Sequence, residues 1–402
     1  MFPAITICNK NPFVTENGTK FLSLFQVSPH RNSSPNEDEV LFTNLLEAAL
    51  NAKNPGFSDE LKKSFGYPIE DMLIKCHFTE IRCSANDFYW YYDFNYGNCY
   101  TFNSGYNATG HRVPIRTVQK PGRFAGLYLQ LFIGRPQSVY LSEFTSGIHL
   151  LISNQSVPLS LSEGINAKPG TITNVDIKKV FTNRLPEPYS ECKDLNKFNS
   201  TLFDEIQKSN HKYRQKDCFD LCLQKIVIEK CNCYDLQFPK LFNSTPCLSK
   251  TEMNCSEHLS SEFLYYDLNK MCSSQCPLEC DSITYDLSTS TANYPTRMYS
   301  KLLKKQSKIT RYFKNEEVTF DKLKESLVAL DINYAELKYT YISESASKTI
   351  IDLIASIGGT IGLFLGKLKF LVFTNKYVIY DSIYFKKRNI TAQCCGNSRA
   401  CI

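Results

Sequence analysis

Two stretches, 218-CFDLC-222 and 272-CSSQCPLEC-280, place cysteines at intervals of four residues. Residues that are four apart lie above one another on one face of an α-helix. Two such helices packed antiparallel bring their columns of sulfur atoms face to face, so the spacing predicts a helical hairpin closed by a ladder of disulfides. The predicted rungs are Cys222–Cys272, Cys218–Cys276 and Cys192–Cys280.

The block from Cys192 to Cys280 holds ten of the 17 cysteines, and four of these remain to close loops between the rungs. These four are Cys231, Cys233, Cys247 and Cys255. Free thiols or a metal site are the alternatives, because C-x-C and C-x3-C spacings occur in zinc sites. The chain has only six histidines, however, and the block has no C-x-x-C pair. The block therefore favours disulfides and an oxidising compartment.

The composition is that of a packed globular protein, with 43% hydrophobic and 13% aromatic residues in 402. The net charge of +6 comes from basic residues spread along the chain, so we expect no nucleic-acid partner. The sequence has no nucleophile elbow, P-loop or H-E-x-x-H motif. It therefore argues against an enzyme, and we expect no metal and no cofactor.

Asn-x-Ser/Thr sequons also indicate a chain exposed outside the cell. The candidate glycosylation sites are Asn17, Asn32, Asn107, Asn154 and Asn199. Asn389 also lies in a sequon, and Asn243 and Asn254 are weaker acceptors because of the adjacent Pro246 and Cys255. Residues 1–10 lack the pattern of a signal peptide. An extracellular composition without an export signal suggests that an upstream segment is missing.

Hydrophobic periodicity indicates a mixed α+β chain. Helical spacing runs from Glu37 to Lys63 with a break at Asn54-Pro55-Gly56, and a further helix is expected over Leu61–His77 with an interruption at Tyr67-Pro68. A basic helix is expected over Lys301–Lys308. The expected strands are Phe2–Cys8, Leu127–Ile133, Gly147–Ile152, Ser282–Leu287 and Ser326–Lys338.

The last apolar segment, Ile350–Phe385, has small residues every three or four positions, a pattern that allows close helix packing in a membrane. Its uncharged part, Leu353–Gly366, is shorter than the roughly 20 residues of a spanning helix. A spanning helix, a re-entrant or interfacial segment and a buried core helix all remain open. The basic run Lys386–Arg388 that follows favours a cytoplasmic location for the end of the chain.

Several motifs taken together resemble the degenerin/epithelial sodium channel/acid-sensing ion channel family over residues 1 to about 366. Each motif alone is weak, and their conjunction is specific. The motifs are Phe2–Asn9, Cys76–Ser84, Tyr96–Gly105, Arg184–Tyr189, Cys218–Cys233, Cys276–Cys280 and Gly358–Gly366.

The resemblance implies a disulfide-rich, clenched-hand ectodomain with a C-terminal membrane helix, and with the first membrane helix of the family missing. The implied parts are the start of the palm (1–30), the finger (31–95), palm and β-ball strands (96–190), the thumb (191–282), the knuckle and returning palm strands (283–345), an atypical second membrane helix (346–386) and a cytoplasmic tail (387–402). It also implies the pairs Cys231–Cys255, Cys233–Cys247 and Cys76–Cys83, and leaves Cys99 either free or paired with Cys8.

The implied function is that of a subunit of a homo- or heterotrimeric, amiloride-sensitive sodium channel in the plasma membrane, mostly extracellular and opened by a proton or a peptide. The expected pore and filter positions are Ala355, Gly358, Gly359, Gly362, Gly366, Lys367 and Leu368. Lys367 departs from the family's Gly-Ala-Ser filter. Three subunits would place a ring of lysines at the constriction, which opposes cation passage. A truncated, non-conducting isoform that binds ligand or modulates related subunits is therefore the alternative.

Ligand-sensing residues are less clearly marked. The carboxylates Glu37, Asp38 and Glu39 could join an acidic pocket with the thumb, but a solvated loop is the favoured interpretation. His77 and His149 lie in strand-like segments and are interpreted as structural residues and not as proton sensors, although histidine titrates in the right range.

Overall fold

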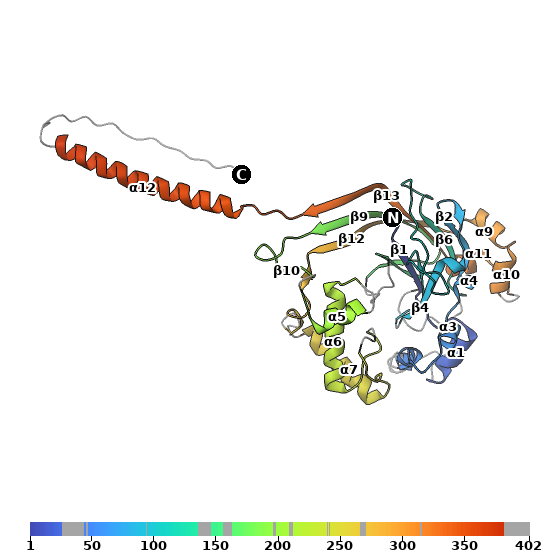
Figure 1. Ribbon diagram of the computed structural model, residues 1–402. Coiled ribbons are helices and arrows are strands. Elements are labelled where there is room, and N and C mark those ends of the chain that lie inside the picture. Colours follow the sequence, from blue (N-terminus) through green and yellow to red (C-terminus); the bar gives the residue numbers. More distant parts are fainter. Residues whose placement is uncertain are drawn as a thin grey trace, which may run out of the picture. The chain divides into compact units, whose positions relative to one another are not determined.

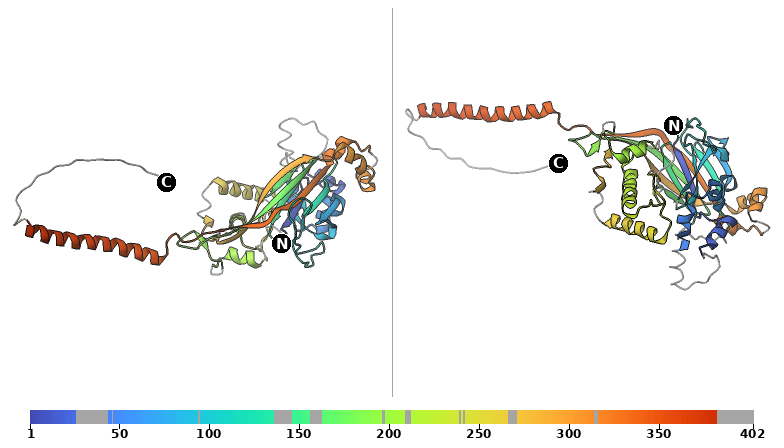
Figure 2. Two further views of the ribbon diagram at one scale, coloured as in Figure 1. Left: turned by 90° about the horizontal axis from the view of Figure 1, so that it is seen from above. Right: turned by 60° about the horizontal axis from the view of Figure 1, so that its bottom comes forward.

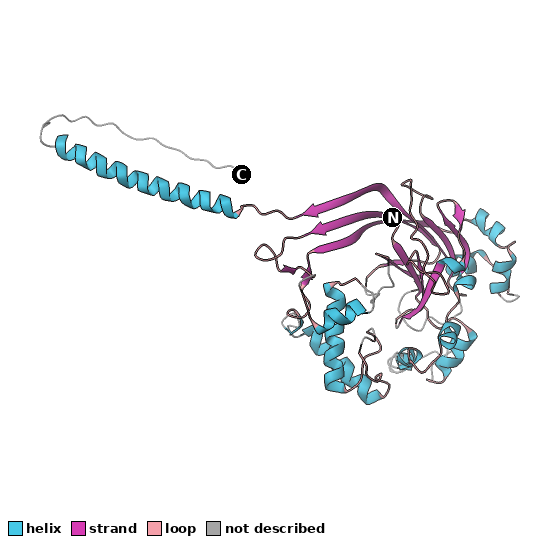
Figure 3. Cartoon of the chain, in the orientation of Figure 1, coloured by secondary structure: helices cyan, strands magenta, loops and turns pink. Residues whose placement is uncertain are grey.

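A computed structural model of the protein describes residues 1–25, 44–45, 47–93, 95–135, 146–155, 163–195, 198–208, 212–238, 240, 242–265, 271–313 and 316–381. The chain forms two compact units, residues 1–344 and 345–402. Strands and helices are mixed throughout the first unit, so the predicted α+β class is confirmed (Figures 1 and 3).

Two sheets form the centre of the first unit. The smaller has the strand order β4-β5-β1-β7-β8 and the larger the order β12-β9-β13-β6-β2-β3. The strands of the smaller sheet are β1 (Ala4–Asn9), β4 (Phe88–Asp93), β5 (Gly97–Phe102), β7 (Ile148–Ser153) and β8 (Ile165–Ala167). Those of the larger sheet are β2 (Leu73–Phe78), β3 (Ile81–Arg82), β6 (Leu127–Phe132), β9 (Thr171–Asn183), β12 (Asp281–Asn293) and β13 (Leu327–Ser343).

The main core lies where these sheets face each other. Ile5 and Ile7 of β1 and Phe102 of β5 join Leu129 of β6 and Leu330 of β13 in one cluster of fully buried side chains. Strand β13 changes character along its length, because its first eight residues are buried and its last eight are exposed. The exposed half runs beside β9 and β12 as a three-stranded extension (Figures 1 and 2).

Short helices surround the sheets (Figure 3). On the side of residues 1–72 these are α1 (Glu16–Ser23), a helical turn at 47–52, α3 (Asp59–Phe65) and α4 (Ile69–Met72). The disulfide block contributes α5 (Thr201–Lys208), α6 (Gln215–Cys231), α7 (Lys250–Tyr265) and the short paired strands β10 (Cys192–Lys193) and β11 (Leu278–Glu279). Before β13 lie α9 (Arg297–Leu303), α10 (Ser307–Tyr312) and α11 (Phe320–Ser326).

All five predicted strands are confirmed, and two helix predictions need correction. The expected helix over Leu61–His77 breaks at Tyr67-Pro68 as predicted, but it ends at Met72 and is followed by β2. A register shift between Leu73 and Lys75 interrupts the alternation of buried and exposed side chains along β2. For this reason β2 is hard to recognise as a strand from the sequence. The basic run 301–308 is also divided, between α9 and α10.

The second unit is described through one long helix, α12 (Ile350–Asp381). It begins four residues after the expected start at 346, and the expected tail 387–402 lies outside the described residues. Its first part, Ile350–Lys369, is long and apolar enough to cross a membrane, and none of the most hydrophobic window of that span is buried. Its length and composition fit the spanning helix among the three alternatives from the sequence.

Candidate functional site

The predicted rungs of the ladder are present in the structure. Disulfides join Cys222 to Cys272, Cys218 to Cys276 and Cys192 to Cys280. The predicted helical hairpin is nevertheless only partly confirmed, because one of its two cysteine segments is a helix and the other is not. Cys218 and Cys222 lie one turn apart on α6, but Cys276 lies in a turn and Cys280 after β11. Pro277 explains the difference, because a proline disfavours the helical conformation of the residue before it.

The remaining disulfides lie in the same block and in the two sheets. Cys231–Cys255 ties the end of α6 to α7, Cys233–Cys247 closes the intervening loop, and Cys76–Cys83 closes the β2–β3 hairpin. Cys99, which the sequence left free or paired, bonds to Cys8. The separation of 91 residues is no obstacle, since β1 and β5 are neighbouring strands with Cys8 directly opposite Cys99.

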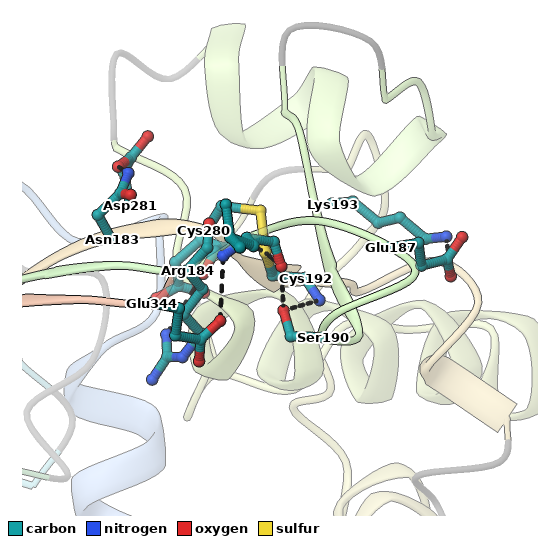
Figure 4. Close-up of a disulfide and its surroundings, with 11 residues drawn as sticks. Asn183, Arg184, Glu187, Ser190, Cys192, Lys193, Cys280, Asp281 and Glu344 are labelled. Carbon is teal, nitrogen blue, oxygen red and sulfur yellow. Dashed lines mark hydrogen bonds and ion pairs between the residues drawn. A yellow bond between two sulfur atoms is a disulfide. The ribbon is translucent and has the colours of Figure 1, made fainter. Parts of the chain in front are cut away.

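The Cys192–Cys280 disulfide lies at a junction where the disulfide block meets the ends of the long strands (Figure 4). The amide of Arg184 donates to the carbonyl of Cys280 over 2.8 Å, and the amide of Glu344 donates to the carbonyl of Asn183 over 3.0 Å. The Glu344 carboxylate accepts a further bond from the amide of Leu185 over 3.0 Å. The turn after β9 is thus bound both to the disulfide block and to the last residue of the first unit.

A small cavity of 110 Å³ separates the 47–52 helix from the loop and helix that follow α6. Three carboxylate side chains line it, from Glu47, Asp235 and Glu257, together with Lys250. The buried Asp235 is fixed, because its carboxylate accepts bonds from the amide of Gln237 over 2.7 Å and from the Ser256 hydroxyl. The expected acidic residues 37–39 lie outside the described residues, so Glu47 is the carboxylate of this region that the structure places at the cavity.

A second charged cluster joins the first turns of α6 to the β7–β8 connection. The Glu163 carboxylate pairs with Arg214 over 3.2 Å and with Lys216 over 2.9 Å. Arg214 also makes a bidentate contact with the buried Asp217, over 2.8 and 2.7 Å. Asp220 lies one turn further along α6, and burial together with the negative charge of Asp217 raises its pKa to about 6.

The two histidines differ in their surroundings. His149 is buried and stacks on Tyr96 with ring centroids 4.4 Å apart, while its ring nitrogens contact Asn166 Oδ1 over 3.1 Å and the Glu163 carbonyl over 3.0 Å. His77 is half-buried on β2. Burial and the charges of Lys75 and Arg82 lower the pKa of His77. The tightly held His149 fits the structural role expected from the sequence.

The candidate glycosylation sites are not equally accessible. Asn17 on α1 and Asn199 before α5 are exposed, whereas Asn107 and Asn154 are half-buried. The Asn154 amide oxygen accepts a bond from the Tyr285 hydroxyl over 3.1 Å. Asn32 lies outside the described residues. Glycosylation stays a prediction, and the geometry favours Asn17 and Asn199.

The candidate membrane segment of α12 has two chemically different sides. Successive residues of an α-helix are rotated by about 100°, so side chains can be assigned to faces by position. Large apolar side chains dominate one face, at Ile354, Ile357, Ile361, Leu365 and Leu368. The rest of the circumference carries mainly small and polar residues. The glycines Gly358, Gly359, Gly362 and Gly366 lie there within an arc of about 100°, together with Ala355 and Lys369. Ser356, Thr360 and Lys367 lie on the remaining part, between the glycines and the apolar face, and Ile351 and Leu363 are the large apolar exceptions.

The glycines of α12 have no packing partner within the described part of the second unit. A Cβ atom added at Gly358, Gly359, Gly362 or Gly366 would meet no other atom within 4 Å. Contacts within this unit therefore give no reason for glycine at these positions, although glycine weakens an isolated helix. Close contact with other membrane helices, or a water-filled path, would give that reason. Of the expected filter residues, Gly366 lies among the glycines, Lys367 lies about 100° further around the helix, and Leu368 lies on the apolar face.

Comparison with known proteins agrees with this arrangement. The family model for the amiloride-sensitive sodium channel matches residues 1–367. The chain belongs to this family. Its members are ion channels of the plasma membrane and not enzymes, and they form multimeric assemblies that carry sodium.

Similar curated proteins come from all three branches named by the sequence motifs. Epithelial sodium channel subunit beta-2 of Xenopus laevis is 25% identical over 347 residues, which are 85% of this chain and 51% of that protein. Degenerin del-1 of Caenorhabditis elegans is 27% identical over 82% of this chain and 47% of its own length. Acid-sensing ion channel 1C of Danio rerio is 28% identical over 91% of this chain and 67% of its own length. The chain thus spans about half the length of the first two relatives.

Proposed function

We propose that this chain is a subunit of a trimeric, amiloride-sensitive channel that carries sodium ions across the plasma membrane and is opened by an extracellular ligand. The observation that carries the proposal is the two-sided α12. A helix that has one apolar side, and glycines, hydroxyls and lysines around the rest of its circumference, suits a position between lipid and a water-filled path. Family membership supports sodium as the ion.

The arrangement of the first unit supports a route from ligand to pore. The disulfide ladder makes the 192–280 block rigid, and the Cys192–Cys280 junction ties it to the ends of β9 and β13. The chain then continues through the segment 344–349 into α12. A ligand that contacts both the 192–280 block and the 47–52 helix, and that binds the open and closed states with different affinity, would shift the equilibrium between these states. The carboxylate cavity beside Asp235 is the proposed place for a ligand other than the proton.

The proton is the ligand with the most specific support, and Asp220 is the proposed sensor. Its pKa of about 6 lies above its ordinary value, so mild acid neutralises it within the Glu163–Arg214 cluster. We expect an acid step from about pH 7.5 to 5 to evoke an inward sodium current, and Asp220→Asn to remove the component of that response near pH 6. Asp204→Asn, an exposed carboxylate on α5, is the matched control.

Stability gives an independent check on Asp220. Because its pKa is higher in the folded chain than its unfolded value of about 3.9, the stability that it contributes is fully present below that value. This contribution is lost as the pH rises through about 6. At pH 7, Asp220→Asn should therefore stabilise the chain, by at most about 3 kcal/mol at about 1.4 kcal/mol per pKa unit. Identical pH responses of Asp220→Asn, Asp204→Asn and the unmodified chain would exclude Asp220 as the sensor.

A non-conducting subunit is the second candidate. Lys367 favours it, since three copies of this lysine around one path in a trimer would form a ring of positive charge that repels sodium. Such a chain would bind ligand or lower the current of related subunits, and it would carry no sodium current of its own.

A further inference from the structure

A second and larger cavity, of 680 Å³, lies in the first unit and shares no lining residue with the carboxylate cavity. One wall is the β2–β3 hairpin with the residues just after it, and the facing wall comes from α9 and the start of α10. The family resemblance and the proposed gating route leave this cavity without a role. Its volume is in the range of sites for small organic molecules, which are usually a few hundred to a thousand cubic ångströms.

Both walls are held in place by contacts independent of any ligand. The Cys76–Cys83 disulfide closes the hairpin, and its turn residues Thr79 and Glu80 have positive φ angles of 49° and 71°. On the facing wall the Lys308 ammonium donates to the carbonyl of Leu73 over 2.6 Å and to that of Glu70. These contacts fix α10 against the start of β2, so the cavity is preformed.

The lining is positively charged. Lys75, Arg82 and Lys308 contribute three cations, against the single carboxylate of Glu70. Among the described residues, neither Lys75 nor Arg82 forms an ion pair with a carboxylate. The neighbouring His77 is affected by these charges. Burial, and next to it the positive charges of Lys75 and Arg82, lower the pKa of His77.

Neutral polar groups complete the site. Gln130 is held by two tyrosines, since its amide nitrogen donates to the Tyr128 hydroxyl over 2.6 Å and its amide oxygen accepts from the Tyr299 hydroxyl over 3.2 Å. Tyr299 lines the cavity and offers an aromatic surface beside the cations. A rigid, positively charged cavity with an aromatic side is complementary to an anion that has a flat carbon skeleton.

We propose that the cavity between the β2–β3 hairpin and α9–α10 binds a small organic dicarboxylate, whose carboxylates contact Lys75 and Arg82 and whose skeleton lies against Tyr299. Each contact is a charge-assisted hydrogen bond, and guanidinium and ammonium groups favour carboxylates for that reason. This proposal is independent of whether the chain conducts sodium.

The test measures binding of terephthalate to the purified full chain in detergent by calorimetry, at low ionic strength because exposed charges are screened by salt. We expect saturable binding with a dissociation constant of about 1 mM or tighter. Terephthalamide, the neutral analogue of the same shape, should bind at least about tenfold more weakly, since it lacks the charge-assisted bonds.

Matched variants locate the site. The double variant Lys75→Met/Arg82→Gln should weaken terephthalate binding by at least about tenfold. Lys301→Gln/Lys305→Gln removes two basic residues that do not line the cavity. This variant should change the dissociation constant for terephthalate by no more than about twofold. Terephthalate should also raise the melting temperature of the unmodified chain but not that of Lys75→Met/Arg82→Gln. Absence of saturable binding, equal binding of the amide, or unchanged binding by that variant would each overturn the proposal.

Discussion

Replacing Lys367 by serine is expected to increase the unitary sodium current at least about tenfold. Lys367 lies within the candidate membrane segment, outside the apolar face of α12 and beside Ser356 and Thr360 around the helix. In a trimer this side chain would occur three times around one path. Two unit charges about 4 Å apart repel by about 1 kcal/mol even in water, and three lysines would add about 3 kcal/mol to the barrier for sodium. Screening by counter-ions reduces that figure, and about 1.4 kcal/mol already changes a rate tenfold.

Leu368→Ser is the control for this prediction. It introduces the same side chain one position further along, on the apolar side of α12. Single-channel recording of both variants separates a change at the pore from a general loosening of the helix. Equal currents from the unmodified chain and Lys367→Ser, or an equal gain from Leu368→Ser, would mean that Lys367 does not face the conducting path.

Removal of one rung of the ladder, by Cys218→Ala/Cys276→Ala, is expected to lower the free energy of unfolding by about 4 kcal/mol. Because the neighbouring rung Cys222–Cys272 stays in place, this rung closes an effective loop of about ten residues, which contributes about 3 kcal/mol through the entropy of the unfolded chain. Both cysteines are fully buried beside Leu202, Ile206 and Leu221, so the loss of packing adds to the effect. Alanine is chosen because it buries no hydroxyl group.

The hairpin pair gives the comparison for the ladder. Cys76–Cys83 closes a loop of only seven residues, so Cys76→Ala/Cys83→Ala should cost only about 2 kcal/mol by the same relation. Denaturant unfolding of both variants without reductant measures the difference. If the hairpin variant proved as unstable as the ladder variant, the packing of the buried rung would not contribute to stability beyond loop closure.

The cysteine spacings predicted the rungs better than they predicted the secondary structure. The interval of four between Cys218 and Cys222 reflects a helix, whereas the same interval from Cys276 to Cys280 arises from a turn and a short strand. Pro277 was the available signal against a second helix. The Cys8–Cys99 bond could not be derived from spacing, because it depends on which strands become neighbours.

The candidate sites also differ in how far they could be predicted from the sequence, depending on whether their residues are close together in the chain. The glycines and Lys367 of α12 are close in sequence, so the sequence alone identified them. Both cavities join segments far apart in the chain, as Lys75 and Lys308 do at the cationic one. Periodicity places residues on the faces of single elements. It contains no information on which elements meet, and the dicarboxylate site therefore had no counterpart in the sequence.

The measurement that tests the central claim most directly is the reversal potential of the membrane current in cells expressing this protein, at rest and after an acid step. A sodium channel subunit predicts an amiloride-blocked inward current whose reversal potential shifts by about 59 mV for each tenfold change in external sodium. A surface-expressed chain that yields no such current, or one whose reversal potential ignores external sodium, would contradict the claim and leave the non-conducting subunit as the better description.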